Sequence, residues 1–266
     1  SRSNARIKAI RGLRRRQERD AAGWFFVEGI RLVGEALQLR APVETLVVAP
    51  GLLARHPFGQ ELVADYQRSG ADLLEMSDDV FASLSTRDGP QGLGAVVRQR
   101  WHRLDDIEPA GELAWVALEG VQDPGNLGTI LRTSDAVGAG GVILLGHATD
   151  PYDPTALRAS MGAIFAQRLI RTDPAELGAW SRRHHDAVVG TSDAAAADYT
   201  SIRYQRPTLL LMGSEREGLS PASQTLAGTM VRIPMVGRGD SLNLAVATAV
   251  MLYEVFNQCR NEGLRT

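Results

Sequence analysis

The sequence predicts an α/β protein in which a smaller N-terminal unit precedes a larger unit built on a parallel sheet. Strand-like and helix-like segments alternate along nearly all of its 266 residues, which is the pattern of α/β folds. Near-continuous apolar runs at 142–145 and 209–212 are typical of parallel strands covered on both faces. Between the two alternating regions, the polar segment 101–112 is acidic, contains Pro and Gly, and has the composition of a linker.

The N-terminal unit is assigned to residues 1–100. A first helix is expected to start at a cap, Ser3 or Asn4, and to continue to about Ala22. The elements that follow alternate, with strands expected at 24–27, 45–49, 72–76 and 92–99, and helices at 28–39, 60–69 and 78–84.

The larger unit is assigned to residues 113–266. Its strands are expected at 113–118, 141–145, 165–170, 187–190, 208–212 and 230–233, and its helices at 127–137, 155–161, 175–184, 221–226 and 242–259. The last helix follows a Gly-rich loop, and Asp240 or Ser241 is its expected N-cap.

The composition, 44% hydrophobic and 23% charged, is that of an ordinary globular protein. No apolar run approaches the ~20 residues that span a bilayer, and no signal peptide opens the sequence. A cytoplasmic protein without a membrane partner is therefore expected. Cys259 is the only cysteine, which excludes an internal disulfide, and the histidines lack metal-ligand spacing, so no metal is expected.

Positive charge is concentrated at the N-terminus. Residues 1–20 carry eight basic side chains against two acidic ones, a local charge of +6 in a chain whose net charge is -2. A basic arm on an acidic body indicates a polyanionic partner, although a solvated first helix would look the same. The candidate contacts are Arg6, Lys8, Arg11, Arg14, Arg15 and Arg16.

Several common site signatures are missing. The sequence has no G-x-G-x-x-G after its first strand, no P-loop lysine and no G-x-S-x-G turn. Instead, three stretches each join a strand end to glycines and polar side chains. In the first, 119–132, a turn opens a helix that presents Asn126 and Arg132, a combination suited to phosphate. A simple turn with a surface arginine is the alternative.

The second stretch, 212–220, runs from a buried strand into a Gly-x-Glu-x-x-Gly sequence. Gly213 would allow close backbone approach, and Glu215 would lie at the carboxyl end of the strand, where α/β folds bind ligands. The third stretch, 233–243, carries two glycines and then places Ser241 and Asn243 at the start of the last helix. Alone, these two stretches could be a solvated loop and a capped connection.

Taken together, the three stretches resemble the SpoU (TrmH-type) family of S-adenosylmethionine-dependent RNA ribose 2'-O-methyltransferases. The resemblance rests on NLGTILRTSDAVGAGGVIL, LLLMGSEREGLS and IPMVGRGDSLNLAVATAVMLYE, which have the order and spacing of the three family motifs. The N-terminal unit is similar to the ribosomal-protein-like substrate-binding domain often fused to this family, through its first 37 residues and PQGLGAVV. One departure is Leu244-Ala245, where the family often has Val-Ser.

The resemblance implies a C-terminal α/β knot, a deep trefoil knot with a parallel sheet flanked by helices, beside a smaller α/β RNA-binding domain. Knots are otherwise almost absent from protein folds. S-adenosylmethionine would be held in the knot, mostly by backbone groups. By matching motif positions, the cofactor residues are Met212, Gly213, Ile233, Met235 and Leu242. The family also implies a homodimer, in which catalytic residues of one subunit meet the cofactor of the other and the last helix contributes to the contact.

The implied reaction is methyl transfer to a ribose 2'-oxygen, and the family assigns proton removal to the position of Arg132. Arginine normally stays protonated, so Arg132 could instead bind the neighbouring phosphate and orient the hydroxyl while water takes the proton. Asn126, Glu215, Ser241 and Asn243 would position the reacting groups.

The implied substrate is a structured RNA, since only RNA offers a 2'-hydroxyl. The two-domain layout favours ribosomal RNA of the large subunit, a group that includes enzymes conferring resistance to ribosome-targeting antibiotics. Transfer RNA methylation is one alternative, and a non-catalytic RNA-binding or ribosome-assembly factor is another. A small-molecule methyltransferase is disfavoured by the basic arm.

Overall fold

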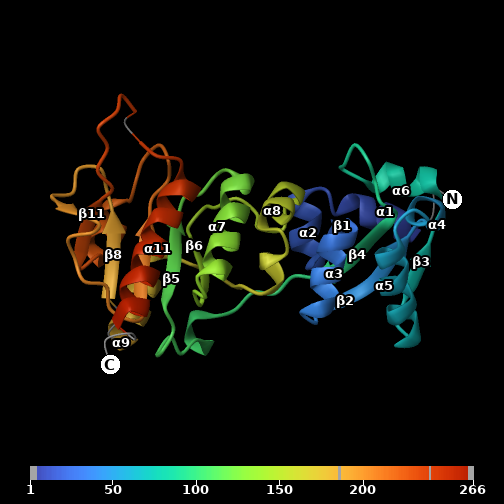
Figure 1. Ribbon diagram of the computed structural model, residues 1–266, viewed down its shortest axis with the longest axis horizontal. Coiled ribbons are helices and arrows are strands. Elements are labelled where there is room, and N and C mark those ends of the chain that lie inside the picture. The colour runs from blue at the N-terminus through green and yellow to red at the C-terminus, as the bar shows by residue number, and fades with distance from the viewer. Residues whose placement is uncertain (1–4, 185–186, 240, 263–266) are drawn as a thin grey trace. The chain divides into compact units, whose positions relative to one another are not determined.

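The computed structural model describes residues 5–184, 187–239 and 241–262. The chain divides into two compact units, which are considered separately (Figure 1). Unit 1 comprises Ser1–Gln99 with Tyr152–Phe165, and unit 2 comprises Arg100–Pro151 with Ala166–Thr266. Within the described ranges, no helix is both long and apolar enough to cross a membrane.

Unit 1 is built on a mixed four-stranded sheet in the order β1-β4-β2-β3. Its strands are β1 (Trp24–Glu28), β2 (Val43–Val48), β3 (Leu73–Glu75) and β4 (Leu93–Arg98). Only the β2–β3 pair is parallel. Its helices are α1 (Ala5–Gly12), α2 (Arg16–Ala22), α3 (Ile30–Gln38), α4 (Pro50–Leu53), α5 (Pro57–Arg68), α6 (Asp78–Leu84) and α8 (Pro154–Ser160), with the 3-10 turn η2 (Ala163–Phe165). The short helix α4 is absent from the sequence prediction.

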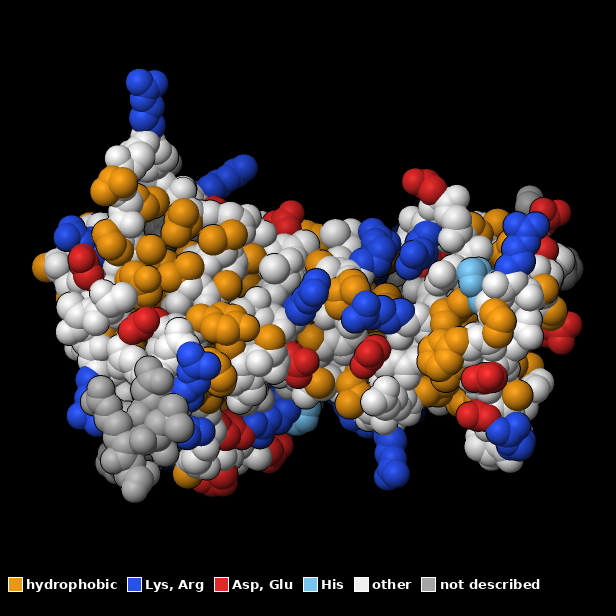
Figure 2. Space-filling model, viewed as in Figure 1, with side chains coloured by type: hydrophobic (Ala, Val, Ile, Leu, Met, Phe, Trp, Pro, Cys, Tyr) orange, Lys and Arg blue, Asp and Glu red, His pale blue; other side chains and the backbone are white. Residues whose placement is uncertain are grey.

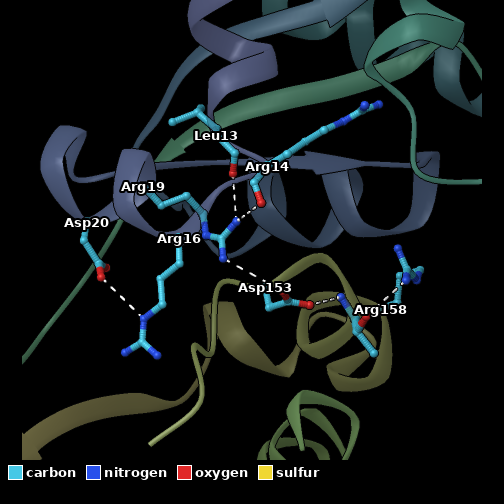
Figure 3. A network of polar contacts seen from close by, with 8 residues as sticks. Leu13, Arg14, Arg16, Arg19, Asp20, Asp153 and Arg158 are labelled. Atoms are coloured by element: carbon cyan, nitrogen blue, oxygen red, sulfur yellow. Dashed lines mark hydrogen bonds and ion pairs between the residues drawn. The ribbon is translucent and has the colours of Figure 1, made fainter. Parts of the chain in front are cut away.

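The single first helix expected from the sequence is wrong, because the chain breaks between α1 and α2. The cause is Arg19, whose side chain is only 2% exposed. Its Nη1 donates to the carbonyls of Leu13 at 2.9 Å and Arg14 at 2.8 Å, and its guanidinium lies 3.9 Å from a carboxylate oxygen of Asp153 (Figure 3). These carbonyls follow the end of α1, so the buried arginine satisfies groups that a continuing helix would have paired. The expected caps, Ser3 and Asn4, lie outside the described residues.

Unit 2 is built on a seven-stranded parallel sheet in the order β7-β6-β5-β10-β8-β11-β9. Its strands are β5 (Ala114–Glu119), β6 (Gly141–Leu145), β7 (Arg168–Thr172), β8 (Ala187–Thr191), β9 (Ala197–Asp198), β10 (Thr208–Met212) and β11 (Thr229–Arg232). The sequence prediction missed only the two-residue β9. Its helices are α7 (Pro124–Ala136), α9 (Pro174–His184), α10 (Pro221–Leu226) and α11 (Leu244–Glu262), with the 3-10 turn η1 (Leu104–Asp106).

Helices cover both faces of this sheet. On one face, α9, α10 and η1 pack on alternate side chains of the central strands, including Trp115, Ile143 and Leu209. Helices α7 and α11 pack against each other and lie in front of the sheet in Figure 1. The predicted α/β class, with a flanked parallel sheet and a smaller N-terminal unit, is confirmed.

The predicted start of the last helix is corrected. Helix α11 begins at Leu244, and Asn243 caps it by accepting hydrogen bonds from the backbone N–H groups of Ala245 at 2.9 Å and Val246 at 3.2 Å. Ser241 therefore precedes the cap, while Asp240 lies outside the described residues. Asn and Ser are similarly good caps, so local sequence alone could not choose between these positions.

Candidate active site

A pocket of about 340 Å³ opens in unit 2 beside the carboxyl ends of β8, β10 and β11. Its wall is formed by the segments 191–193 and 212–219, by Ile233 and Met235, and by residues just before and within the first turn of α11. The carboxyl ends of parallel strands are where open α/β sheets bind ligands. The volume lies at the lower end of the ~300–1,000 Å³ range of small-molecule sites.

This pocket brings together the residues that the motifs assign to the cofactor. They are Met212, Gly213, Ile233, Met235 and Leu242, and all of them line it. Met212 is buried, whereas Met235 and Leu242, in the segment between β11 and α11, are 38% and 37% exposed. Apolar side chains combined with strand-end backbone suit a ligand with a flat apolar ring and polar substituents. The residues present therefore fit a nucleoside-containing cofactor.

Gly213 is required by the fold of the pocket wall. A Cβ at this position would overlap the backbone of Gly218 and Leu219, where the loop after β10 returns to the strand end. The predicted close backbone approach at Gly213 therefore involves the protein's own loop. This packing shapes the wall that the segment 212–219 presents to the pocket.

Three predicted catalytic residues form one hydrogen-bonded chain at the edge of the pocket. Asn126, near the start of α7, donates through Nδ2 to Glu215 Oε1, and its Oδ1 accepts from Asn243 Nδ2 at 2.9 Å. Since Asn243 also caps α11, Asn126 joins the starts of two helices to the loop after β10. Such mutual bonding fixes the side-chain rotamers before any ligand binds.

A second set of hydrogen bonds, which the sequence did not indicate, fixes the end of the same loop to the end of β5. Glu119 ends β5 and accepts from the backbone N–H of Ser220 at 2.8 Å and from its hydroxyl at 2.7 Å. Ser220 is in turn the N-cap of α10. Asp123 caps α7 by accepting from the N–H of Asn126 at 2.6 Å. Glu119 and Asp123 are thus positioning residues for the predicted site.

Ser241 and Arg132 occupy different places. Ser241 lines the pocket and is exposed. Arg132 lies six residues beyond Asn126 on α7, about 9 Å further along the helix axis, and is not part of the pocket wall. Its side chain is exposed, and within the described ranges it makes no hydrogen bond or ion pair. The structure therefore brings Asn126, Glu215, Ser241 and Asn243 to one site and leaves Arg132 outside it.

The segment at the carboxyl end of β8 was not identified from the sequence as part of the site. Thr191, Ser192 and Asp193 line the pocket, and the Thr191 hydroxyl donates to the Leu211 carbonyl at 3.3 Å. The available signal was their position directly after a predicted parallel strand, as in the three stretches that were chosen.

The predicted RNA-binding side chains lie on α1, α2 and the break between them, and most are bonded within unit 1. Arg6 pairs with Asp72, Arg11 donates to Ser83 Oγ at 3.0 Å, and Arg14 donates to the carbonyls of Ser83 and Ser85. Arg15, which immediately precedes α2, pairs with Glu18, and Arg16 pairs with Asp20 within α2. Lys8 is exposed. Their role toward RNA stays a prediction. Across the described residues, no group of three His, Cys, Asp or Glu side chains could hold a metal ion.

Comparison with known protein families decides the relationship. Residues 114–253 match the model of the SpoU rRNA Methylase family, which covers more than half of the chain. The chain belongs to this family. Residues 4–95 match a second model, the MRM3-like substrate binding domain.

Individual relatives of this SpoU methylase match along nearly its whole length. The 23S rRNA (uridine(2479)-2'-O)-methyltransferase of Streptomyces viridochromogenes is 34% identical, over 96% of this chain and 90% of the relative. The 23S rRNA (guanosine(2553)-2'-O)-methyltransferase RlmP of Bacillus subtilis is 28% identical, over 96% and 97%. A crystal structure of an AdoMet-bound rRNA methyltransferase from Sinorhizobium meliloti superposes with a TM-score of 0.88 at 40% identity, covering 97% of this chain and 96% of that one.

Proposed function

We propose that this protein is an S-adenosylmethionine-dependent enzyme that methylates a ribose 2'-hydroxyl in ribosomal RNA of the large subunit. One observation carries the proposal: the pocket at the strand ends contains every residue that the motifs assign to the cofactor, beside the bonded Asn126, Glu215 and Asn243. Family membership and two relatives that act on 23S rRNA support the same activity. A ribosomal substrate would place the enzyme in the cytoplasm.

S-adenosylmethionine would supply an activated methyl group on a cationic sulfonium. The apolar side chains of Met212, Ile233 and Leu242 would contact its adenine, while strand-end backbone groups would bond its polar edges. Among the described residues, the pocket wall carries three carboxylates, Asp193, Glu215 and Glu217, against the single guanidinium of Arg216. This excess of negative charge favours a cationic ligand.

Arg132 would act in the pocket of a second subunit, which explains its distance from the pocket of its own chain. A homodimer would place α7 and α11 at the contact. Support comes from α11, where Val246 and Tyr253 are 51% and 45% exposed and stand seven residues apart on one side of the helix. The chain from β11 to α11 would pass through the loop after β10 to form the trefoil knot. Two observations support that path: Asn243 donates a hydrogen bond to Asn126, and Leu242 lines the same pocket as Met212.

The protein's contribution to the reaction would be alignment. Arg132 would hold the phosphate next to the target ribose and turn its 2'-hydroxyl toward the pocket, and water would receive the hydroxyl proton. Asn126, Glu215 and Asn243 would keep the facing wall rigid, with Ser241 beside the ribose. Most of the acceleration would then arise from positioning rather than from proton transfer to a side chain.

The test is transfer of labelled methyl from S-adenosylmethionine to ribosomal and transfer RNA that lack the modification, followed by digestion to nucleosides. The expected product is one 2'-O-methylnucleoside, mapped to one position of 23S rRNA. Label in transfer RNA alone would move the substrate to the second RNA class. Label in neither pool, from protein that binds S-adenosylmethionine by calorimetry, would overturn the proposal.

A further inference from the structure

Unit 1 contains a second concave surface, distinct from the pocket of unit 2. This surface, called here the α3–α5 groove, has a volume of about 1,180 Å³ and lies between α3, α5, the segment 86–91 and the end of α8. Its volume exceeds the ~300–1,000 Å³ that enclose a single small molecule. Figure 2 shows apolar side chains gathered beside basic ones and a histidine over this part of unit 1.

The groove is positively charged. Its wall carries Arg31, Arg55, Arg87 and Arg158 against the two carboxylates of Glu35 and Asp88. Arg158 donates to Thr86 Oγ1 at 3.0 Å and so belongs to the framework of the groove. The guanidinium groups of Arg31, Arg55 and Arg87 are different, because they make no hydrogen bond or ion pair with any residue that the structure describes. Three exposed cations with unused donors are available for phosphate.

The N-terminus of α3 adds to this charge. Gly29 precedes α3 with a φ of 103°, which favours glycine, and a Cβ built there would lie 3.0 Å from Nη1 of Arg87. Arg87 therefore lies over the start of the helix, whose first N–H group, at Ile30, donates to Gln91 Oε1 at 3.1 Å. The helix dipole and Arg87 both favour an anion at this end of the groove.

An exposed aromatic ring stands among these cations. Phe58, in the first turn of α5, is 59% exposed, the largest exposure of any aromatic side chain among the described residues. One edge of its ring lies against Gly34 of α3, where a Cβ would be 3.7 Å from Phe58 Cε1. A ring that is supported on one side and open on the other is a platform on which an unpaired base can stack.

We propose that the α3–α5 groove binds an unpaired stretch of the substrate RNA, with a base stacked on Phe58 and its flanking phosphates held by Arg31, Arg55 and Arg87. This proposal rests on the proposed function, since it assigns a docking site for the RNA that the pocket of unit 2 would modify. It also differs from a contact through α1 and α2, where most arginines already bond within unit 1. In a duplex, both faces of each base are already stacked, so no base could stack on Phe58. The groove would therefore bind single-stranded RNA in preference to a duplex.

The test measures binding of the full chain to a fluorescein-labelled single-stranded RNA by anisotropy, across a salt series. Arg31→Ala with Arg87→Ala is expected to weaken binding at least tenfold and to reduce the slope of log K against log salt by about 1.4, or 0.7 for each lost phosphate contact. Phe58→Leu is expected to weaken binding about tenfold with an unchanged slope, because stacking is lost while charge is kept. Arg68→Ala is the matched control, an exposed arginine of the same helix α5 that pairs with Asp65.

Either of two binding results, or unchanged methylation by the groove variants, would overturn the groove. Binding by both groove variants within twofold of wild type, with the Arg68→Ala control equal to them, would exclude it as an RNA site. Competition by poly-glutamate as strong as by single-stranded RNA would show a general anion surface. Calorimetry of S-adenosylmethionine verifies that unit 2 is intact in each variant. If wild type methylates rRNA and the groove variants do so equally well, only the groove fails; if wild type methylates no RNA, the proposed function fails whatever the groove binds.

Discussion

Helices α1 and α2 of unit 1 and the pocket edge of unit 2 use their polar side chains in different ways. In unit 1, the basic side chains of α1 and α2 mostly bond to groups of the unit itself, and Arg19 is buried against carbonyls. In unit 2, Asn126, Glu215 and Asn243 bond to one another at the edge of an open pocket, and the nearby Arg132 faces solvent. The bonds of α1 and α2 stabilise unit 1 itself, whereas the bonds in unit 2 fix side chains beside a cavity that a ligand can enter.

This comparison predicts a separation of effects. Substitutions in the bonded region of unit 1 should lower the free energy of unfolding and leave the properties of the cofactor pocket unchanged. Substitutions around the pocket of unit 2 should lower methyl transfer and leave unfolding almost unchanged. A substitution that strongly lowered both the free energy of unfolding and methyl transfer would contradict this comparison.

The largest effect is expected for Arg132→Ala. If Arg132 orients the hydroxyl, its removal should lower the turnover number for RNA methylation by roughly a thousandfold, a part of the ~10⁵–10⁸ that alignment of reacting groups can contribute. S-adenosylmethionine affinity by calorimetry and the urea midpoint should change little, because the side chain is exposed and makes no hydrogen bond or ion pair within the described ranges.

Arg132→Lys separates the positive charge of this residue from the paired hydrogen-bond donors of its guanidinium. A lysine keeps the positive charge but loses the paired donors of the guanidinium, so phosphate-dependent orientation should be only partly restored. Methylation by Arg132→Ala near the wild-type rate, with cofactor binding intact, would remove Arg132 from the proposed active site.

The next effect is on stability. Arg19→Ala should lower the free energy of unfolding by about 2–3 kcal/mol, because it leaves the carbonyls of Leu13 and Arg14 without their donor and unpairs Asp153. The value lies below the ~3–5 kcal/mol for a fully buried pair because the Asp153 side chain is 35% exposed. Urea unfolding followed by circular dichroism measures it.

Arg15→Ala is the matched control for Arg19→Ala. Arg15 pairs with Glu18 at 2.9 Å, but both side chains are at least half exposed, so its loss should change the free energy of unfolding by less than about 0.5 kcal/mol. Equal losses for the two variants would show that burial of Arg19 contributes nothing. Cofactor affinity should be unchanged in both, since neither residue lines the pocket.

The difference between the units also explains which features of the site could be predicted from the sequence. In unit 2, the ends of parallel strands meet at one edge of the sheet, so motifs that follow strands were expected to converge. Met212, Gly213, Ile233, Met235 and Leu242 do line one pocket. Thr191 follows the same rule and was missed only because its strand carried no motif.

In unit 1, local charge could not show which arginines are already bonded. The partners of Arg6 and Arg11 are Asp72 and Ser83, far along the chain, and nothing near residue 19 indicates that its side chain would be buried beside Asp153. The break between α1 and α2 has the same origin. The buried Arg19 bonds to the carbonyls of Leu13 and Arg14 and lies beside Asp153 of a distant segment, and these contacts overrode a helical pattern that was locally consistent.

A smaller effect is expected at Asn126, which links both halves of the site wall. Asn126→Ala should lower methyl transfer by roughly 10–50-fold, because Glu215 and Asn243 lose their shared partner and the wall loses its fixed geometry. Asn126→Asp keeps the shape and the acceptor for Asn243 but sets a carboxylate against Glu215, so it should be at least as inactive. Activity close to wild type in Asn126→Asp would show that the bond to Glu215 is not used. Labelled-methyl transfer, with calorimetry of S-adenosylmethionine, measures both variants.

The smallest effect, at His102, tests whether stability and catalysis also separate inside unit 2. Burial, with the charge of Arg168 second, lowers the pKa of His102 below its ordinary value of 6.5. The fold therefore holds His102 neutral, and unfolding takes up a proton at pH values between the folded and the unfolded pKa. The stability that this group contributes is fully present above about pH 6.5. It is lost as the pH falls from there through the lower pKa of the folded state.

Urea unfolding at pH 7.5, 6.0 and 5.0 measures this dependence. Wild type should lose slightly more stability on acidification than His102→Gln, which has no titrating ring. The affinity for S-adenosylmethionine should show the same pH dependence in both proteins, because His102 does not line the pocket. Parallel stability profiles would mean that His102 can be protonated in place. A pH-dependent difference in cofactor affinity would instead couple this residue to the site, and the separation between folding and binding groups would then fail within unit 2 itself.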